Sequence, residues 1–99
     1  MDMNQLMEQA KDLQSKVSAA QDLLAHTSVK GIAGKGLVVV ELSGKYDLIK
    51  LTLNPDILRE NLETITSLIS AAYKDAKEKA DATIDRVMTE ATAGVPLPE

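Results

Sequence analysis

Few side chains in this chain of 99 residues could carry out chemistry on a substrate. It has a single histidine, His26, and no cysteine, so a thiolate nucleophile is absent and no metal-ligand spacing is found. His26 follows a predicted helix, where the helix dipole favours a solvated terminal imidazole. The carboxylates fall mostly on outward helix faces, where solvated acids are usual. We therefore expect no catalytic residue, no metal site, no cofactor and no small-molecule substrate, and so no enzyme.

A glycine-rich segment at residues 30–36 has the composition of a phosphate-binding loop but not its pattern. A Walker loop needs glycine five residues before its Gly-Lys pair and Ser or Thr after it, and Val29 and Gly36 occupy those positions. Gly31 and Gly34 match the GXXG loop of KH domains only superficially, because the structural context of that loop is absent. The glycines are better explained as a flexible lead into a strand.

The basic residues could bind phosphate groups, although the formal net charge is −4. An acidic chain is not an obvious nucleic-acid binder. On a helical wheel of the last predicted helix, Lys79 and Arg86 lie on one flank, about 10.5 Å apart along the axis. They could contact phosphates, or they could serve solubility and i,i+4 pairing, as Asp75 and Lys79 permit. The residues alone favour the second explanation.

The element that would position everything else is a β-hairpin at residues 36–53, with a tight turn at residues 43–45. Apolar residues alternate along both of its strands, which places each set on one face; they are Val38, Val40, Leu42, Ile49, Leu51 and Leu53. A lone hairpin is marginal in water, so helices must cover this face.

Helices are predicted on both sides of the hairpin, at residues 4–25 and 61–92. Both carry heptad stripes of apolar residues, which predict packing against another helix, either within the chain or in a second subunit. Pro55 stops the second strand, with Asn54 as a cap, and Asn61 caps the long helix. A short third strand at residues 29–32 is an additional expectation.

The predicted fold is therefore α+β, in the order α–β–β(–β)–α with a small antiparallel sheet. We expect a single domain over residues 1–99, with residues 93–99 as a flexible tail. The second face of the hairpin presents Leu37, Val39 and Leu48 beside polar residues, and it is too apolar for open solvent. We assign these three residues to a homodimer interface. No aliphatic run is long enough to span a bilayer, so no membrane partner is expected.

Five stretches stand out as an ordered set; in chain order they are residues 3–10, residues 34–40 with 43–44, residues 51–58, residues 68–76 and, as a Gly/Pro/Leu ending, residues 94–98. Together they resemble the YbaB/EbfC family of small bacterial nucleoid-associated proteins. No single stretch is specific, but the ordered set covers nearly the whole chain. The chain departs from the family in its last helix, which is net acidic where family members often carry more bases.

The resemblance implies a tweezer-like homodimer that is joined through its sheet region and binds duplex DNA with its projecting helices. It also implies a cytoplasmic, nucleoid-associated protein with a role in nucleoid organisation or gene regulation. Wheel positions assign the phosphate contacts to Lys11, Lys16, Lys79 and Arg86. No aromatic side chain is placed to stack on bases, so single strands are not expected as ligands. The alternative function is a dimeric protein–protein interaction module with little DNA affinity.

Overall fold

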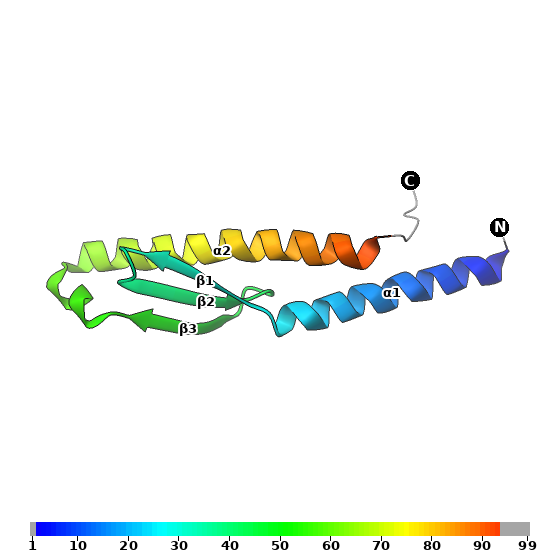
Figure 1. Cartoon of the computed structure of the whole chain (residues 1–99), viewed down its shortest axis with the longest axis horizontal. Coiled ribbons are helices and arrows are strands. Elements are labelled where there is room, and N and C mark those ends of the chain that lie inside the picture. The colour runs from blue at the N-terminus through cyan, green and yellow to red at the C-terminus, as the bar shows by residue number, and fades with distance from the viewer. Residues whose placement is uncertain (1, 94–99) are drawn as a thin grey trace.

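The computed structural model describes residues 2–93 and shows two helices joined by a small sheet (Figure 1). The elements are α1 (Met3–Ala25), β1 (Ser28–Ala33), β2 (Val38–Ser43), β3 (Leu48–Leu53), a short 3-10 helix η1 (Pro55–Arg59) and α2 (Leu62–Thr92). This confirms the predicted α+β fold. The additional strand expected at residues 29–32 is present as β1, and it has the same length as the other two strands. The predicted tail begins at Ala93, which caps α2, and its remaining residues lie outside the described part.

Side-chain caps define where the helices begin, as the sequence predicts for two of them. The Asn54 side chain accepts a hydrogen bond from the Asp56 backbone N–H, and Pro55 is the first residue of η1. The Asn61 side chain accepts from the Thr64 N–H at 2.8 Å at the start of α2. Each cap satisfies a backbone donor that the helix itself leaves unpaired.

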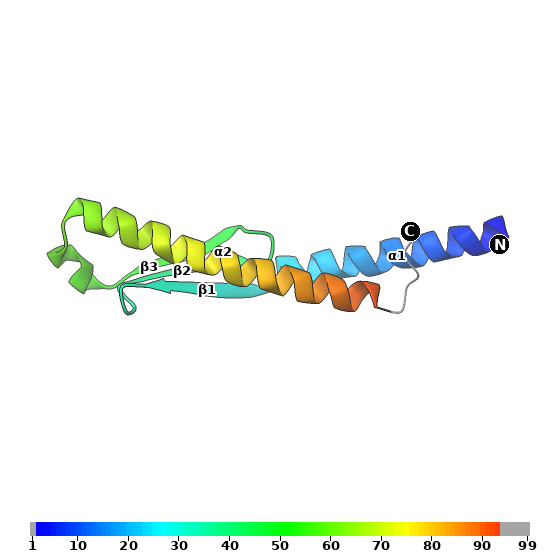
Figure 2. The same ribbon diagram turned by 90° about the horizontal axis from the view of Figure 1, so that it is seen from above.

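The sheet is antiparallel in the order β1–β2–β3, and α2 packs on β1 and β2 (Figures 1 and 2). The core between them consists of Val38, Val40, Leu42, Ile57, Ala72 and Ala76. The closest approach is between the alanines of α2 and Gly31 of β1, and Val29, Ala33, Ile65, Leu68 and Ile69 pack around it. A Cβ at Gly31 would lie 2.0 Å from the Ala72 carbonyl oxygen and 2.3 Å from the Ala76 nitrogen. Glycine at this position therefore allows the backbones of β1 and α2 to approach closely.

The burial of β3 differs from the prediction. Helices were expected to cover the apolar faces of both hairpin strands, but no helix covers that of β3. Its leucines and isoleucine are between 42% and 60% exposed, since α2 packs on β1 and β2 instead. A register shift between Glu41 and Leu42 also pairs Leu42 with Leu48 and leaves Ile49 extra. Leu48 is thus opposite a core residue on the helix-facing side of the sheet. Simple alternation places Leu48 on the other face with Leu37 and Val39, whereas the shifted register pairs it with Leu42.

The molecule is long and thin, with extents of 68 × 22 × 16 Å. Its radius of gyration is 19.2 Å, whereas a compact domain of this length has about 13 Å. The elongated shape results from the position of α1. The C-terminal part of α1 packs on the C-terminal part of α2 through Ala20, Leu24 and Val87. The N-terminal half of α1 extends past the end of α2 (Figures 1 and 2). The heptad stripe of α1 is therefore buried within the chain only in the second half of that helix. Met3 and Leu6, in its first half, are exposed.

Candidate nucleic-acid interface

Charge is unevenly distributed between the helices and the sheet. Helix α2 carries six acids and four bases, and α1 carries three acids and two bases. The segment from β1 to β3, residues 28–53, has four lysines and only two acids. The projecting helices are thus net acidic while the sheet region is net basic. Any DNA contact by the helices must come from individual side chains rather than from a strongly positive surface.

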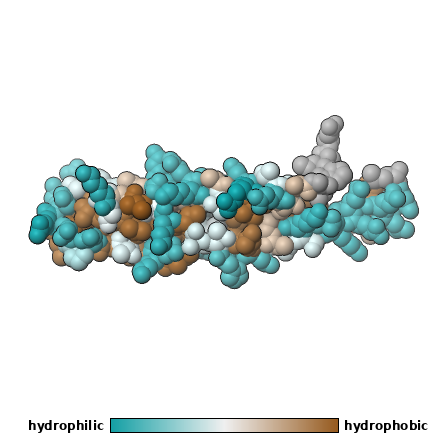
Figure 3. Space-filling model, in the orientation of Figure 1, coloured by the Kyte–Doolittle hydropathy of each residue, from teal (hydrophilic) through white to brown (hydrophobic). Residues whose placement is uncertain are grey.

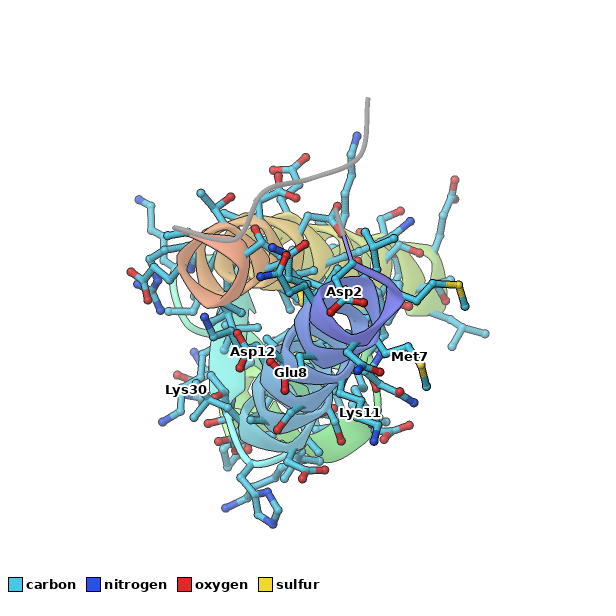
Figure 4. The ribbon with its side chains drawn as sticks, turned by 90° about the vertical axis from the view of Figure 1, so that its right-hand side faces the viewer. Asp2, Met7, Glu8, Lys11, Asp12 and Lys30 are labelled. Carbon is cyan, nitrogen blue, oxygen red and sulfur yellow. The ribbon has the colours of Figure 1, made fainter. Side chains whose placement is uncertain are left out.

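The two predicted DNA-binding residues of α1 have different surroundings. Lys16 forms an i,i+4 ion pair with Asp12 at 3.4 Å, and it borders an open groove between α1 and the C-terminal end of α2. Lys11 lies on the part of α1 that extends beyond α2, and it forms no ion pair within the described residues. Figure 4 shows Lys11 and Met7 on one side of α1, with Glu8 and Asp12 on another. Lys11 is therefore the more available cation of the two.

The two predicted residues of α2 also differ from each other. The Lys79 ammonium donates a hydrogen bond to the Lys30 carbonyl oxygen at 2.8 Å and pairs with Asp75 at 3.1 Å. Asp75 in turn accepts a hydrogen bond from the Ile32 N–H at 3.0 Å, and this bond and Lys79 lower the pKa of the Asp75 carboxyl. Lys79 thus connects α2 to the edge of β1. Arg86 is exposed, and no ion pair of its own is found in residues 2–93.

The four bases form a line along the molecule rather than a cluster. Helices α1 and α2 run antiparallel, with Ala20 beside Val87 (Figure 1). Along the common axis the order is Lys79, Arg86, Lys16 and Lys11, over about 25 Å at 1.5 Å per helical residue. Bases spaced in this way could contact successive phosphates of a backbone, and Lys16 also borders the groove between α1 and α2. No group of three His, Asp or Glu residues that could hold a metal ion is found in the described residues.

The structure brings together two groups of surface residues whose arrangement the sequence did not predict. Lys30 and Lys50 lie on either side of Glu41 in the strand register, which makes a mainly basic row across the sheet. The uncertain position of the first strand concealed this row, because only the register places Lys30 next to Glu41. The second group is an apolar surface around β3 and η1, and it contains Leu48, Ile49, Leu51, Leu53, Leu58 and Leu62. Alternation along β3 is its sequence signal, but that signal predicts a covered face.

The turn between β2 and β3 is held in place by a contact with α2. Tyr46 adopts a φ of 67°, and its hydroxyl donates a hydrogen bond to the Asp81 carboxylate of α2. This hydrogen bond, followed by burial and the nearby negative charges, raises the pKa of the Tyr46 phenol. The turn is therefore attached to α2, and Asp81 is occupied by a structural contact.

Comparison with known proteins adds what the geometry of these helices does not give. Residues 1–95 match the model of the YbaB/EbfC DNA-binding family. The chain belongs to this family. None of the described helices combines the length and the apolar character that crossing a membrane requires.

Relatives in the YbaB/EbfC family align over nearly the whole chain. A nucleoid-associated protein of Gluconobacter oxydans is 45% identical over 94 residues, which are 94% of this chain and 88% of the relative. Nucleoid-associated proteins of Bordetella avium and Agrobacterium fabrum are each 41% identical, and they cover 94% and 98% of this chain and 86% and 92% of their own lengths. The resemblance inferred from the five stretches is confirmed, and with it membership of a nucleoid-associated, DNA-binding family rather than a known enzyme family.

The fold is also found in a solved structure. The crystal structure of an uncharacterized protein from Helicobacter pylori matches with a TM-score of 0.80, and it covers 91% of this chain and 96% of that protein. The two sequences are only 19% identical, so the likeness concerns the fold alone. An elongated arrangement of two helices and a three-stranded sheet is thus not peculiar to this sequence.

Proposed function

We propose that this protein is a non-enzymatic, nucleoid-associated protein of the cytoplasm that binds duplex DNA as a homodimer, mainly through phosphate contacts. Its role would be in nucleoid organisation or gene regulation. The observation that carries the proposal is the match of residues 1–95 to a DNA-binding family. The projecting helices support it, because two long arms on a dimer could lie along opposite sides of a duplex.

The homodimer is proposed to form over β3. The leucines and isoleucine around β3 and η1 are between 42% and 82% exposed, which is unusual for so many large apolar side chains on one surface. Figure 3 shows apolar surface over the sheet half of the molecule, whereas the end formed by α1 is mainly hydrophilic. Of the predicted interface residues, Leu48 belongs to this surface, while Leu37 and Val39 are half-buried within the chain. A second copy would bury the exposed part of these side chains. Full burial from water is worth about 1.5–3 kcal/mol for each, and the half-covered residues of β3 would gain about half of that.

Phosphate contacts are proposed for Lys11, Lys16, Lys79 and Arg86 of both subunits. Lys16 and Lys79 already have carboxylate partners at 3.4 and 3.1 Å, so each must leave or share its partner to bind a phosphate. Lys11 and Arg86 have no such competition in the described residues and should contribute most. Binding of this kind recognises the backbone and carries little information about base sequence.

The salt dependence of binding tests this proposal and counts the contacts. If all four residues of both subunits bind phosphates, the slope of log K against log salt should be about −7. If only Lys11 and Arg86 of both subunits contribute, the slope should be about −3.6. A gel-shift or anisotropy titration of the protein with long duplex DNA, from low to physiological salt, distinguishes these cases. It should show weak, sequence-tolerant binding.

The alternative is a dimeric protein–protein interaction module with little DNA affinity. The net acidic character of α1 and α2 favours it. No binding of duplex DNA at low salt, by a protein shown to be folded and dimeric, would decide for this alternative.

A further inference from the structure

The three-stranded sheet has two edges, and they are treated differently by the rest of the chain. At the outer edge of β1, the Ile32 N–H and the Lys30 carbonyl oxygen are both hydrogen-bonded by side chains of α2. Asp75 accepts from the N–H at 3.0 Å, and Lys79 donates to the carbonyl at 2.8 Å. The two side chains also pair with each other at 3.1 Å. We call Asp75 and Lys79, with these bonds, the edge clasp.

The position of the edge clasp follows from Gly31, the residue between the two clasped ones. Because Gly31 has no side chain, α2 lies close to β1, with Ala72 and Ala76 against the strand. Asp75 and Lys79 are one helical turn apart, so they lie on the same side of α2. From there the short carboxylate reaches Ile32 and the longer ammonium reaches back to Lys30. The clasp thus depends on a backbone approach that only glycine permits.

The edge formed by β3 has no such cover. Among residues 2–93, the only hydrogen bonds that β3 makes with another element are those to β2. Figure 1 shows β3 at the border of the sheet, with no other element beyond it. An uncovered edge strand with apolar side chains is a template for pairing with another chain. The apolar surface around β3 adds to this tendency.

We propose that the edge clasp blocks strand addition at β1, so that a second copy can join only at β3 and assembly stops at a closed dimer. This inference rests on the proposed homodimer and explains what limits it. Pairing of β3 with β3 uses the same surface of both copies and closes on itself. Pairing of β3 with β1 would be head-to-tail, leave a free edge at each end and continue into open-ended assemblies. With β1 blocked, only the closed arrangement remains.

The test replaces both clasp residues with alanine, in Asp75→Ala/Lys79→Ala. Alanine preserves helix propensity, and the net charge is unchanged because one acid and one base are lost. The matched control is Lys77→Ala/Glu78→Ala, which removes the same two charges from exposed neighbouring positions of α2 that make no described hydrogen bond or ion pair. Sedimentation velocity over a range of concentrations gives the mass of each protein, and circular dichroism gives its helix content.

We expect the unmodified protein and the control to have the same mass at all concentrations. The clasp variant should form larger species whose average mass rises with concentration by about 1.5-fold or more, because head-to-tail pairing adds one copy at a time and the smallest step beyond a dimer is a third copy. Asp75→Asn keeps an oxygen that can accept from Ile32, and it should remain at the mass of the unmodified protein. Adding Ile32→Pro to the clasp variant removes the N–H that a new strand would bind, without loss to the ladder with β2, and should reverse the assembly.

A folded clasp variant with the mass of the unmodified protein would overturn the inference. Loss of helix content in that variant would also count against it, because the pair would then serve folding rather than assembly. Equal growth of the control, or large species that persist after Ile32→Pro, would place the new contact elsewhere. The mass of the unmodified protein tests the proposed homodimer separately, since the clasp is judged by the difference between variant and unmodified protein.

Discussion

Replacing Gly31 with alanine tests the close packing of β1 on α2, on which the core and the edge clasp both depend. The added Cβ would lie 2.0 Å from the Ala72 carbonyl oxygen, 2.3 Å from the Ala76 nitrogen and 2.7 Å from the Ala76 Cβ. Two of these three atoms belong to the backbone of α2, so a change of side-chain rotamer cannot relieve the overlap. The helix must move away from the strand by more than about 1 Å to restore ordinary van der Waals distances.

The cost of Gly31→Ala follows from that displacement. Ala72 and Ala76 are fully buried, so moving the helix opens gaps along the whole contact rather than at one point. Overpacking a core typically costs about 1–3 kcal/mol, and overlap with backbone places this substitution at or above the upper end, about 3 kcal/mol. Displacement of α2 should also lengthen the bonds from Asp75 to Ile32 and from Lys79 to Lys30.

Urea unfolding followed by circular dichroism at a fixed protein concentration measures this cost. Gly36→Ala is the comparison, because its Cβ would meet no atom within 4 Å although its φ is +94°. Its penalty is backbone strain alone, about 1–2 kcal/mol. Adding Ala76→Gly to Gly31→Ala should restore little, because it removes only the side-chain contact. A cost below that of Gly36→Ala, or full rescue by Ala76→Gly, would refute the packing argument.

Three further predictions concern the dimer, the DNA contacts and pH. Leu51→Asp places a charge in the centre of the apolar surface around β3, so it should shift the protein from dimer to monomer in analytical ultracentrifugation. Val39→Asp should have this effect only if the dimer uses the opposite face of the sheet. Lys11→Glu/Arg86→Glu should abolish the gel shift with duplex DNA without changing the dimer mass or the helix content. Binding that survives in this variant contradicts the proposed contacts from the helices. In that case Lys30→Glu/Lys50→Glu tests whether the basic row on the sheet binds the DNA. The lowered pKa of Asp75 means that its contribution to stability is complete above the ordinary value of 3.8 and is lost as pH falls through the lower folded value. Acid unfolding of Asp75→Asn should therefore lack this part of the pH dependence, and Glu78→Gln should retain it.

Many features of the fold depend on patterns among residues close together in the chain, so the sequence alone was enough to predict these features. Helix periodicity, the Pro55 break and the caps at Asn54 and Asn61 act within a few residues. They predicted where the second strand ends and the bounds of α2 to within a residue. Alternation in β2 predicted the buried Val38, Val40 and Leu42. The ordered set of stretches identified the family, since it needs only the linear sequence.

Tertiary structure decided which predicted surfaces are covered and which charges are free. The same alternation occurs in β3 as in β2, yet β3 is exposed, because burial depends on where α2 lies and not on the strand itself. A bulge pairs Leu48 with Leu42, and the alternation of apolar residues does not encode that pairing. Lys79 has the same helical position whether it binds DNA or β1, and only the close approach at Gly31 brings the Lys30 carbonyl within its reach. Each of these outcomes depends on contacts between residues distant in the chain, whereas periodicity reports only on neighbours.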